Sequence, residues 1–313
     1  MAVPVRLRWN WQLRNRTVRL GARTVLMGIL NITPDSFSDG GQFVQVEDAI
    51  SRACTLLDSG ADVVDLGGES TRPGASAISP SEELARIMPV LRGLMRRRPD
   101  ALVSVDTYHS ETAQAALDGG AEIVNDVSGG LWDPAMLPLC ARHACGLVLM
   151  HTRGRPEEWK GLPPVPSSEI APLVHRELKQ RAREALAAGV ARDSVVLDPG
   201  FGFGKTLDEN YPLLARFGDF HELGFPLLAG VSRKGFLRRA IEQFEPRGVP
   251  EDALRDGTAA ANVAAILAGA HILRVHDVAS ARHAAAIADS ILRAADELSP
   301  PQAVAISDGQ WLP

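Results

Sequence analysis

The sequence has few cysteines, little uncompensated charge and no long hydrophobic run. Three cysteines among 313 residues cannot all pair and lack metal-site spacing, so a disulfide-stabilised domain is not expected. A net charge of −5, from 33 basic and 38 acidic residues, gives no global field for collecting nucleic acid or an anionic membrane. The most apolar stretch, 258–273, is shorter than the about 20 residues that span a bilayer. Since no apolar stretch follows the arginine-rich start either, no secretory signal is expected. We expect a cytoplasmic protein without nucleic-acid or membrane partners.

What the sequence does contain is eight short apolar runs, at 24–30, 61–67, 101–106, 121–126, 146–151, 194–199, 225–230 and 270–275. They are apolar without alternation, which is typical of parallel strands covered on both faces. Helical patterns separate them, for example at 46–60, 80–97 and 167–189. This alternation predicts an α/β fold with a single (β/α)8 TIM barrel, and a doubly wound open sheet is the alternative.

The rest of the chain divides around this barrel. Residues 6–20 alternate like a β-hairpin that turns near residues 15–16, and we expect the hairpin to plug the lower end of the barrel. The predicted organisation is an N-terminal hairpin at 1–23, the barrel at 24–298 and a short C-terminal tail at 299–313. The alanine-rich stretch 279–298 is either an ordinary outer helix or a surface for a second subunit.

Four connections are long and rich in turn residues: 31–45, 67–79, 151–166 and 243–253. Long loops in compact domains are usually functional or disordered. The first two carry Asp35, Phe37, Thr71 and Arg72 among flexible residues. We therefore expect these two loops to close over a substrate.

Polar side chains stand at the end of every apolar run. They are Asn31, Asp65, Asp106, Asn125, His151, Asp198, the group Ser232, Arg233 and Lys234, and Arg274 with His276. In a barrel these positions share the carboxyl-terminal rim, where the active sites of this fold lie. Capping of the next helix explains any one of them, but it does not readily explain all eight.

Three of these residues suit recognition of a flat heterocycle. Asp106 and Asp198 can accept paired N–H groups from an amidine edge, and the amide of Asn125 supplies a donor and an acceptor. A guanine-like or pterin ring fits this set. Acid–base catalysis and metal binding by the same trio are competing functions, and helix capping is the structural alternative.

Two further groups suit an anion. Ser232 and Lys234 lie where a helix begins, so the hydroxyl, the ammonium group and the backbone N–H groups would bind a carboxylate or phosphate. Alternation places Arg274 and His276 on one side of a strand, facing a diphosphate or a ring.

The glycine-rich segment 199–206 only partly resembles a phosphate loop, because Pro199 replaces the first glycine. Its glycines more simply allow Phe203 to approach a flat ligand closely.

Eight ordered motifs carry a family resemblance across roughly residues 25–280. They are MGILNITPDSFSDGG (27–41), DLGGESTRPGA (65–75), VSVDT (103–107), IVNDVSGG (123–130), VLMH (148–151), LDPGFGFGK (197–205), GVSRKGFL (230–237) and ILRVHDV (272–278). Through them the chain resembles the dihydropteroate synthase family of pterin-binding TIM barrels. The resemblance implies a homodimeric, sulfonamide-targeted transferase of folate biosynthesis that uses Mg²⁺. Its reaction joins 6-hydroxymethyl-7,8-dihydropterin diphosphate to 4-aminobenzoate, giving 7,8-dihydropteroate and diphosphate.

The resemblance also implies a role for each matching residue. The pterin would contact Asp106, Asn125, Met150, Asp198, Lys234 and Arg274. The diphosphate would contact Asn31, Thr71, Arg72, Arg274 and His276, with Asn31 also binding the metal. The aminobenzoate would contact Phe37, Thr71, Pro73, Phe203, Ser232 and Lys234. The catalytic residues would be Asn31, Asp35, Arg72 and Lys234, in a dissociative substitution whose cation Asp35 stabilises.

Two alternatives share the same barrel: a methyltetrahydrofolate-dependent methyltransferase and a non-catalytic paralogue. Both should lack the diphosphate-binding loop residues, whereas Asn31, Asp35 and Arg72 are all present. One departure from the family pattern is Arg153, where a neutral amide is expected, and it leaves the contacts of the 151–166 loop open.

Overall fold

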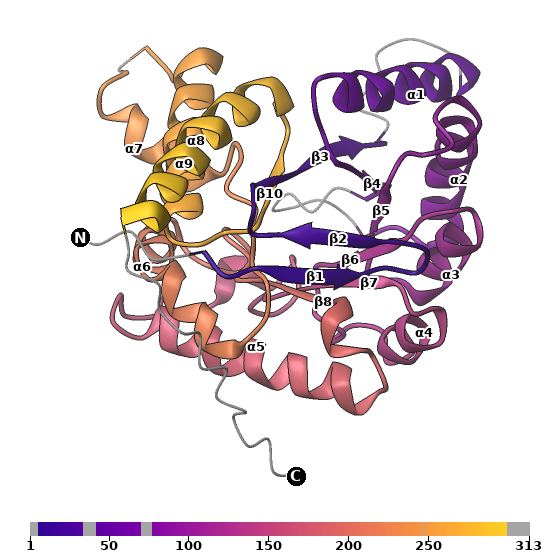
Figure 1. The fold of residues 1–313 in the computed structure, drawn as a ribbon, viewed down its shortest axis with the longest axis horizontal. Coiled ribbons are helices and arrows are strands. Elements are labelled where there is room, and N and C mark those ends of the chain that lie inside the picture. The colour runs from indigo at the N-terminus through magenta and orange to yellow at the C-terminus, as the bar shows by residue number, and fades with distance from the viewer. Residues whose placement is uncertain (1–5, 34–41, 70–76, 246, 299–313) are drawn as a thin grey trace.

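The computed structural model describes residues 6–33, 42–69, 77–245 and 247–298. Eight parallel strands form the wall of a barrel (Figure 1). In chain order they are β3 (Val25–Asn31), β4 (Val63–Gly67), β5 (Val103–Asp106), β6 (Ile123–Asp126), β7 (Gly146–Met150), β8 (Val195–Asp198), β9 (Leu228–Ala229) and β10 (Ile272–Val275). All eight predicted runs are thus strands.

The order of the strands separates a barrel from an open sheet. Their hydrogen-bonded order is β8-β7-β6-β5-β4-β3-β10-β9, so β3 and β10 are neighbours. A parallel bridge between Leu197 and Leu227 links β8 to the segment that leads into β9. The sheet therefore nearly closes on itself, which confirms the predicted barrel.

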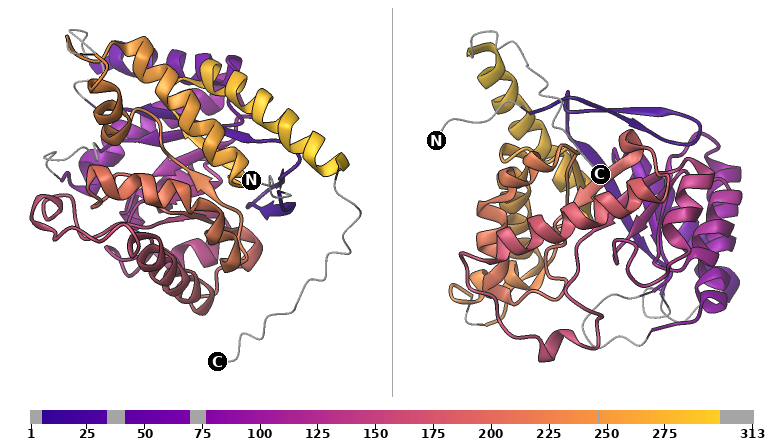
Figure 2. Two further views of the ribbon diagram at one scale, coloured as in Figure 1. Left: turned by 90° about the vertical axis from the view of Figure 1, so that its left-hand side faces the viewer. Right: turned by 90° about the horizontal axis from the view of Figure 1, so that it is seen from below.

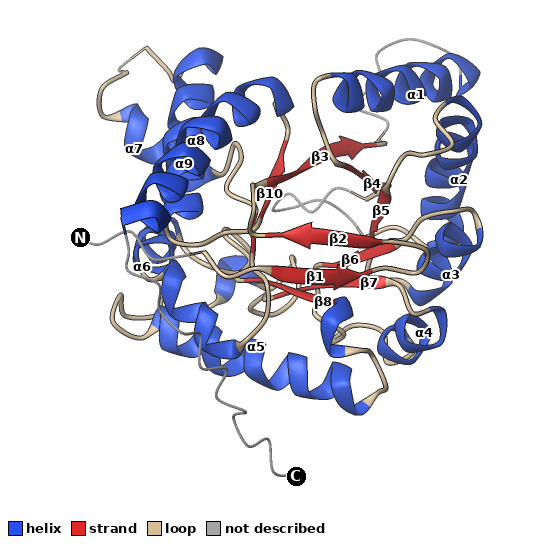
Figure 3. Ribbon diagram, in the orientation of Figure 1, coloured by secondary structure: helices blue, strands red, loops and turns tan. Residues whose placement is uncertain are grey.

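Helices surround the strands on the outside (Figures 2 and 3). They are α1 (Gln42–Asp58), α2 (Pro80–Arg97), α3 (Ser110–Asp118), α4 (Met136–His143), α5 (Ile170–Ala187), α6 (Asn210–Ala215), α7 (Gly235–Glu242), α8 (Glu251–Leu267) and α9 (Val278–Leu298). Helix α2 spans the residues predicted for it, because Ser79 caps it by accepting a hydrogen bond from the Glu82 amide and Pro80 occupies its first turn. In the described part of the chain, no helix has both the length and the apolar character needed to cross a membrane.

The N-terminal hairpin lies across one end of the barrel (Figure 1). Strands β1 (Trp9–Gln12) and β2 (Thr17–Leu20) pair in antiparallel fashion, and the turn between them lies where it was predicted. Trp11 is fully buried and donates its indole N–H to the carbonyl oxygen of Ser194 at 2.8 Å. Its ring packs with Met27, Ile123 and other inward-facing strand residues. The hairpin therefore completes the core at the amino-terminal end and leaves the opposite end for the loops.

Candidate active site

Most of the predicted rim residues meet at the carboxyl ends of the strands. Asn31, Asp106, Met150 and Asp198 are the last residues of β3, β5, β7 and β8. Strand register places Asp106 beside Asn125 and Met150 beside Asp198. Parallel strands in a barrel end at the same rim, so a local sequence pattern becomes one shared site.

Arg274, on β10, connects the acidic residues of this rim. Its Nε lies 2.6 Å from Asp65 Oδ2 and its Nη2 lies 2.5 Å from Asp106 Oδ2. Asn125 donates from Nδ2 to the same Asp65 oxygen at 3.1 Å. Asp65 is fully buried, and through these hydrogen bonds it orients both Arg274 and Asn125. The sequence marked Asp65 only as a strand end and did not indicate this role.

Burial changes the protonation of the two carboxylates predicted to contact the pterin. It raises the pKa of Asp106 to about 7, although Arg274 opposes this shift. Burial likewise raises the pKa of Asp198 to about 6, against a hydrogen bond that the Gly200 amide donates to Asp198 Oδ1 at 2.7 Å. Near neutral pH both groups are therefore poised to exchange a proton or a hydrogen bond with a ligand.

Lys234 and Phe203 form the neighbouring part of the site. The Lys234 ammonium lies 4.1 Å from the centre of the Phe203 ring, within cation–π range. Burial, together with Arg274, lowers the pKa of Lys234 to about 8. Lys234 is also the N-cap residue of α7, so its stem and the first amides of that helix face the same region. This arrangement suits an aromatic ring that carries a negative charge.

The glycine-rich segment brings Phe203 into position. Gly200, Gly202 and Gly204 have φ values of +69°, +79° and +64°, which residues with a Cβ rarely adopt. Lys205 is buried and donates to the carbonyl oxygens of His151, Gly200 and Phe203 at 3.3, 2.7 and 3.2 Å. These three hydrogen bonds from Lys205 hold the backbone of the glycine-rich segment in place. The phosphate-loop alternative, already weak in the sequence, finds no support in this geometry.

Ser232 and His276 lie together beside this region. The Ser232 hydroxyl lies 3.1 Å from His276 Nδ1 and accepts a hydrogen bond from the His276 amide at 3.3 Å. Arg233, between Ser232 and Lys234, has a φ of +55°, and its amide donates to Thr258 Oγ1 at 3.3 Å. A residue predicted for the aminobenzoate carboxylate thus adjoins one predicted for the diphosphate.

Five predicted residues lie outside the described part of the chain. They are Asp35 and Phe37 on the first loop, and Thr71, Arg72 and Pro73 on the second. Their roles stay predictions.

Two contacts at the base of the second loop involve residues that the sequence did not single out. Tyr108 donates its hydroxyl to both carboxylate oxygens of Glu69 at 2.9 Å. The buried Glu83, on α2, accepts from Thr107 Oγ1 at 2.7 Å and lies 3.2 Å from His109 Nδ1. The Glu83 contacts hold the segment that follows Asp106 against α2, and the Tyr108 hydroxyl joins the same segment to the end of β4.

Arg153, the departure from the family pattern, pairs with groups of its own loop and of the segment that follows β8. Its guanidinium donates to the carbonyl oxygens of Pro163 at 2.7 Å and Gly204 at 3.2 Å, and it pairs with Glu209 at 3.3 Å. Arg153 therefore ties the 151–166 loop to the glycine-rich segment. Trp159 of the same loop packs edge-on against Phe203, with ring centres 5.5 Å apart.

The described residues thus form a (β/α)8 barrel whose carboxyl rim carries buried carboxylates, an amide and the cations Lys234 and Arg274, at the end where active sites of this fold lie. The sequence profile of the family described as "Pterin binding enzyme" matches residues 27–276. Since this match covers most of the chain, the chain belongs to the pterin-binding enzyme family.

Individual relatives agree with this assignment. The dihydropteroate synthase of a Synechocystis strain is 42% identical over 87% of this chain and 92% of its own length. A Xanthomonas albilineans dihydropteroate synthase solved with 4-aminobenzoic acid is 38% identical, with a TM-score of 0.78 over 93% of this chain and all of that one. A Yersinia pestis dihydropteroate synthase solved with a sulfonamide drug is 36% identical, with a TM-score of 0.81 over 91% of this chain and 99% of that one.

Proposed function

We propose that this chain acts as a dihydropteroate synthase, a transferase of folate biosynthesis. It joins the exocyclic methylene of 6-hydroxymethyl-7,8-dihydropterin diphosphate to the amino nitrogen of 4-aminobenzoate and releases diphosphate. The observation that carries the proposal is the rim itself, where Asp106, Asn125 and Asp198 converge beside Lys234 and Arg274. Relatives that span nearly the whole chain and bear this enzyme's name support it.

The pterin is held by its hydrogen-bonding edge. Asp198 accepts N–H groups of the pyrimidine ring, and Asn125 pairs with the remaining donor and acceptor. Arg274, fixed by Asp65 and Asp106, lies along the ring, and Met150 lines the pocket as a soft apolar contact. The methylene that bears the diphosphate then points toward the loops that follow β3 and β4.

The substitution is dissociative. The C–O bond to diphosphate breaks first and its electron pair leaves with the diphosphate. The resulting cation at the methylene is stabilised by the electron-rich pterin and by Asp35. The lone pair of the amino nitrogen of 4-aminobenzoate then forms the C–N bond, and the proton that this nitrogen loses passes to an oxygen of the departing diphosphate. Arg72, Thr71 and His276 stabilise the negative charge of the leaving group. Closure of the first two loops excludes water, which would otherwise capture the cation.

A magnesium ion fits this site as a partner of the diphosphate. Gly67 separates the Asn31 and Asp106 side chains: a Cβ on Gly67 would lie 3.6 Å from Asn31 Oδ1 and 3.5 Å from Asp106 Oδ2. Mg²⁺ prefers oxygen ligands and commonly keeps water and substrate phosphates around one or two protein oxygens. Asn31 would hold the ion, which would neutralise charge on the departing diphosphate.

The aminobenzoate lies against Phe203 and the Lys234 stem, with Phe37, Thr71 and Pro73 from the loops and its carboxylate at Ser232. Sulfonamides are para-substituted anilines of similar shape, and the Yersinia pestis relative was solved with one. We expect sulfonamides to compete with 4-aminobenzoate here.

The experiment is an assay of diphosphate and dihydropteroate formation with Mg²⁺, with and without 4-aminobenzoate. We expect dihydropteroate only when both substrates are present. No dihydropteroate under these conditions would overturn the proposal, whereas methyl transfer from methyltetrahydrofolate would favour the methyltransferase alternative. For the mechanism, Asp35→Asn should slow diphosphate release, and an unchanged rate would contradict the cation-stabilising role.

The proposed setting is a homodimer in the cytoplasm. All three cysteines are free, and Cys140 and Cys145 are buried, which suits a reducing compartment. Ile287 and Ile291 lie one turn apart on α9 and are 64% and 41% exposed. Together they give α9 an apolar face that a second subunit would cover.

A further inference from the structure

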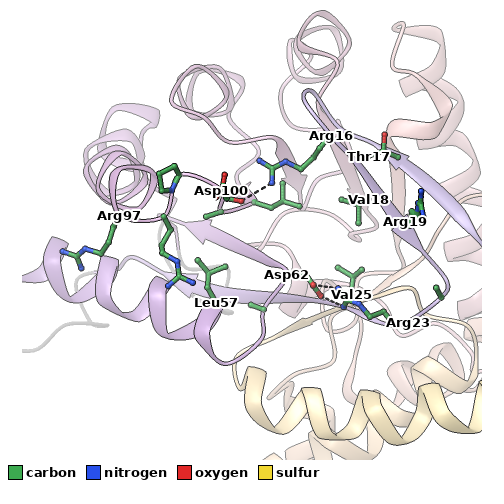
Figure 4. A pocket seen from close by; sticks show the side chains of 16 residues that line it. Arg16, Thr17, Val18, Arg19, Arg23, Val25, Leu57, Asp62, Arg97 and Asp100 are labelled. Atoms are coloured by element: carbon green, nitrogen blue, oxygen red, sulfur yellow. Dashed lines mark hydrogen bonds and ion pairs between the residues drawn. The ribbon is translucent and has the colours of Figure 1, made fainter.

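Charged pairs at the amino-terminal end of the barrel have a structural role. Arg16 donates to the carbonyl oxygen of Asp100 at 3.1 Å, and Arg23 donates to both carboxylate oxygens of Asp62 at 2.6 and 2.8 Å (Figure 4). These contacts join the hairpin and the start of β3 to neighbouring connections of the barrel wall. A hydrogen bond at the opposite end of the barrel, formed by the amide of Arg233, lies instead beside the proposed site.

Residues 231–234 form a tight turn between β9 and α7. The amide of Lys234 donates to the carbonyl oxygen of Val231 at 3.3 Å, which closes the turn. Arg233, at the third position, has a φ of +55°, whereas Ser232, at the second position, does not have a positive φ. This combination is that of a type II turn, whose third position usually holds glycine or asparagine.

Arginine is an unfavourable residue for this position. In the left-handed conformation the Cβ of an L-residue lies too close to the following carbonyl oxygen. A type I turn keeps φ negative at the third position and suits most residues. Among the described residues other than glycine, only Arg233 and Ala144 have a positive φ. A contact outside the turn must therefore stabilise it in its observed form.

Thr258, on α8, supplies this contact. Its Oγ1 accepts a hydrogen bond from the Arg233 amide at 3.3 Å and donates one to the carbonyl oxygen of Leu254 at 2.8 Å. The residue is buried, and because its hydroxyl hydrogen points to Leu254, the lone pairs of the oxygen remain for the Arg233 amide. In a type I turn the peptide between Ser232 and Arg233 would be turned over, and this amide would no longer point toward Thr258.

The turn carries two residues that are proposed to hold the aminobenzoate. Ser232 and Lys234 flank Arg233. The Ser232 hydroxyl lies 3.1 Å from His276 Nδ1, and the Lys234 ammonium lies 4.1 Å from the centre of the Phe203 ring. When only a fraction of the molecules has the conformation that binds a ligand, the apparent affinity falls by that fraction. A turn that exchanges between two forms would therefore weaken aminobenzoate binding, while the pterin contacts at the strand ends stay as they are.

We propose that Thr258 is a positioning residue for 4-aminobenzoate. Its hydroxyl holds the turn at Arg233 in the left-handed form, which places Ser232 and Lys234 for this substrate. Thr258 acts through the turn and does not touch the substrate. This inference rests on the proposed dihydropteroate synthase function and adds a determinant of the affinity for the second substrate.

The test is steady-state kinetics of the full chain with both substrates. Thr258→Val replaces the hydroxyl by a methyl group, so the KM for 4-aminobenzoate should rise about fivefold or more, and the KM for the pterin diphosphate should change much less. Thr258→Ser keeps the hydroxyl and should keep the wild-type KM. Thr112→Val is the matched control, because Thr112 is a buried threonine on α3 whose Oγ1 has no hydrogen-bond partner among the described residues.

A change at Arg233 separates this role from a general loss of stability. Glycine adopts a positive φ without strain, so the turn should keep its form in Arg233→Gly even without the Thr258 hydroxyl. Adding Thr258→Val to Arg233→Gly should therefore leave the KM for 4-aminobenzoate nearly unchanged. Comparison of the double variant with Arg233→Gly alone cancels any direct effect of the arginine side chain.

Hydrogen exchange of the Arg233 amide, followed by NMR, measures the hydrogen bond without catalysis. The amide should be protected in the wild type and in Thr258→Ser, and it should exchange faster in Thr258→Val. A normal KM in Thr258→Val, an increase in KM that persists in the Arg233→Gly background, or an unprotected amide in the wild type would overturn this inference alone. A wild type that forms no dihydropteroate would overturn the proposed function and this role with it.

Discussion

At the scale of single residues, the site contains ionisable groups whose charged forms are disfavoured by burial. Among the described residues, Asp65 and Asp106 pair with Arg274, and Asp198 lies near the buried cations Lys234, Lys205 and Arg274. Asp65 has both Arg274 and Asn125 as partners, whereas burial raises the pKa of Asp106 and Asp198. The two carboxylates that would face the pterin are thus the ones that gain most from a ligand with N–H donors.

This charge distribution predicts the pH dependence of pterin binding. With pKa values of about 7 and 6, Asp106 and Asp198 bind protons as the pH falls from 8 to 5, and a protonated carboxyl accepts N–H groups poorly. The affinity for 6-hydroxymethylpterin should therefore be highest near pH 8 and fall about tenfold or more by pH 5. Calorimetry across this range measures it. Asp198→Asn should bind weakly at pH 8 and show a flatter profile, and tighter binding at pH 5 would contradict the account.

At the scale of elements, the glycine-rich segment after β8 is shaped by backbone that only glycine tolerates well. A Cβ at Gly200 would lie 1.9 Å from the carbonyl oxygen of His151, and its φ is +69°. Gly200→Ala should therefore displace Phe203, raise the KM for 4-aminobenzoate and destabilise the fold by about 1–3 kcal/mol. Steady-state kinetics and urea unfolding measure the two effects.

Gly161→Ala is the matched control, because a Cβ there would meet nothing within 4 Å. It should change neither the KM nor the midpoint of unfolding. Equal behaviour of the two variants would show that the Gly200 backbone is not what positions Phe203.

The hairpin packs against the core at the end of the barrel opposite the proposed site. Trp11→Ala removes a fully buried ring and its hydrogen bond to Ser194, and it should lower the free energy of unfolding by about 3–5 kcal/mol. The remaining folded protein should keep a normal KM for both substrates, because the rim is at the other end of the barrel. Leu131→Ala, at a position that is 51% exposed, should change stability by less than about 0.5 kcal/mol.

The barrel was predictable from the sequence because each strand lies in a short, mainly apolar run, and polar residues stand at or just after the end of these runs. Helix α2 was predicted from its own cap and proline, which are local signals. The contacts of Glu83 with Thr107 and His109, and of Tyr108 with Glu69, were not predicted. These contacts form because the segment that follows β5 packs against one face of α2 and against the end of β4. Such packing between distant segments leaves no local pattern in the sequence. An acidic residue in the first turn of a helix, such as Glu83, is indistinguishable in sequence from one that only interacts with the helix dipole.

At the scale of the whole molecule, the proposed dimer makes a prediction about α9. Ile287→Glu places a charge on the apolar face that a second subunit would cover, so it should convert dimer to monomer in light scattering. Leu131→Glu introduces the same change at an exposed position elsewhere and should leave the mass unchanged. If the wild type is a monomer, or if the Ile287→Glu variant remains a dimer, the proposal that α9 forms the dimer interface is wrong.

At the scale of the whole molecule, the proposed function places the pterin at one location, the carboxyl rim of the barrel. The most direct measurement is a crystal structure of the chain with 6-hydroxymethylpterin diphosphate and Mg²⁺. We expect the pterin ring within hydrogen-bonding distance of Asp106, Asn125 and Asp198, beside Lys234 and Arg274, with its diphosphate toward Asn31 and His276. A pterin bound elsewhere, or bound at the rim without contacting Asp198 and Asn125, would contradict it.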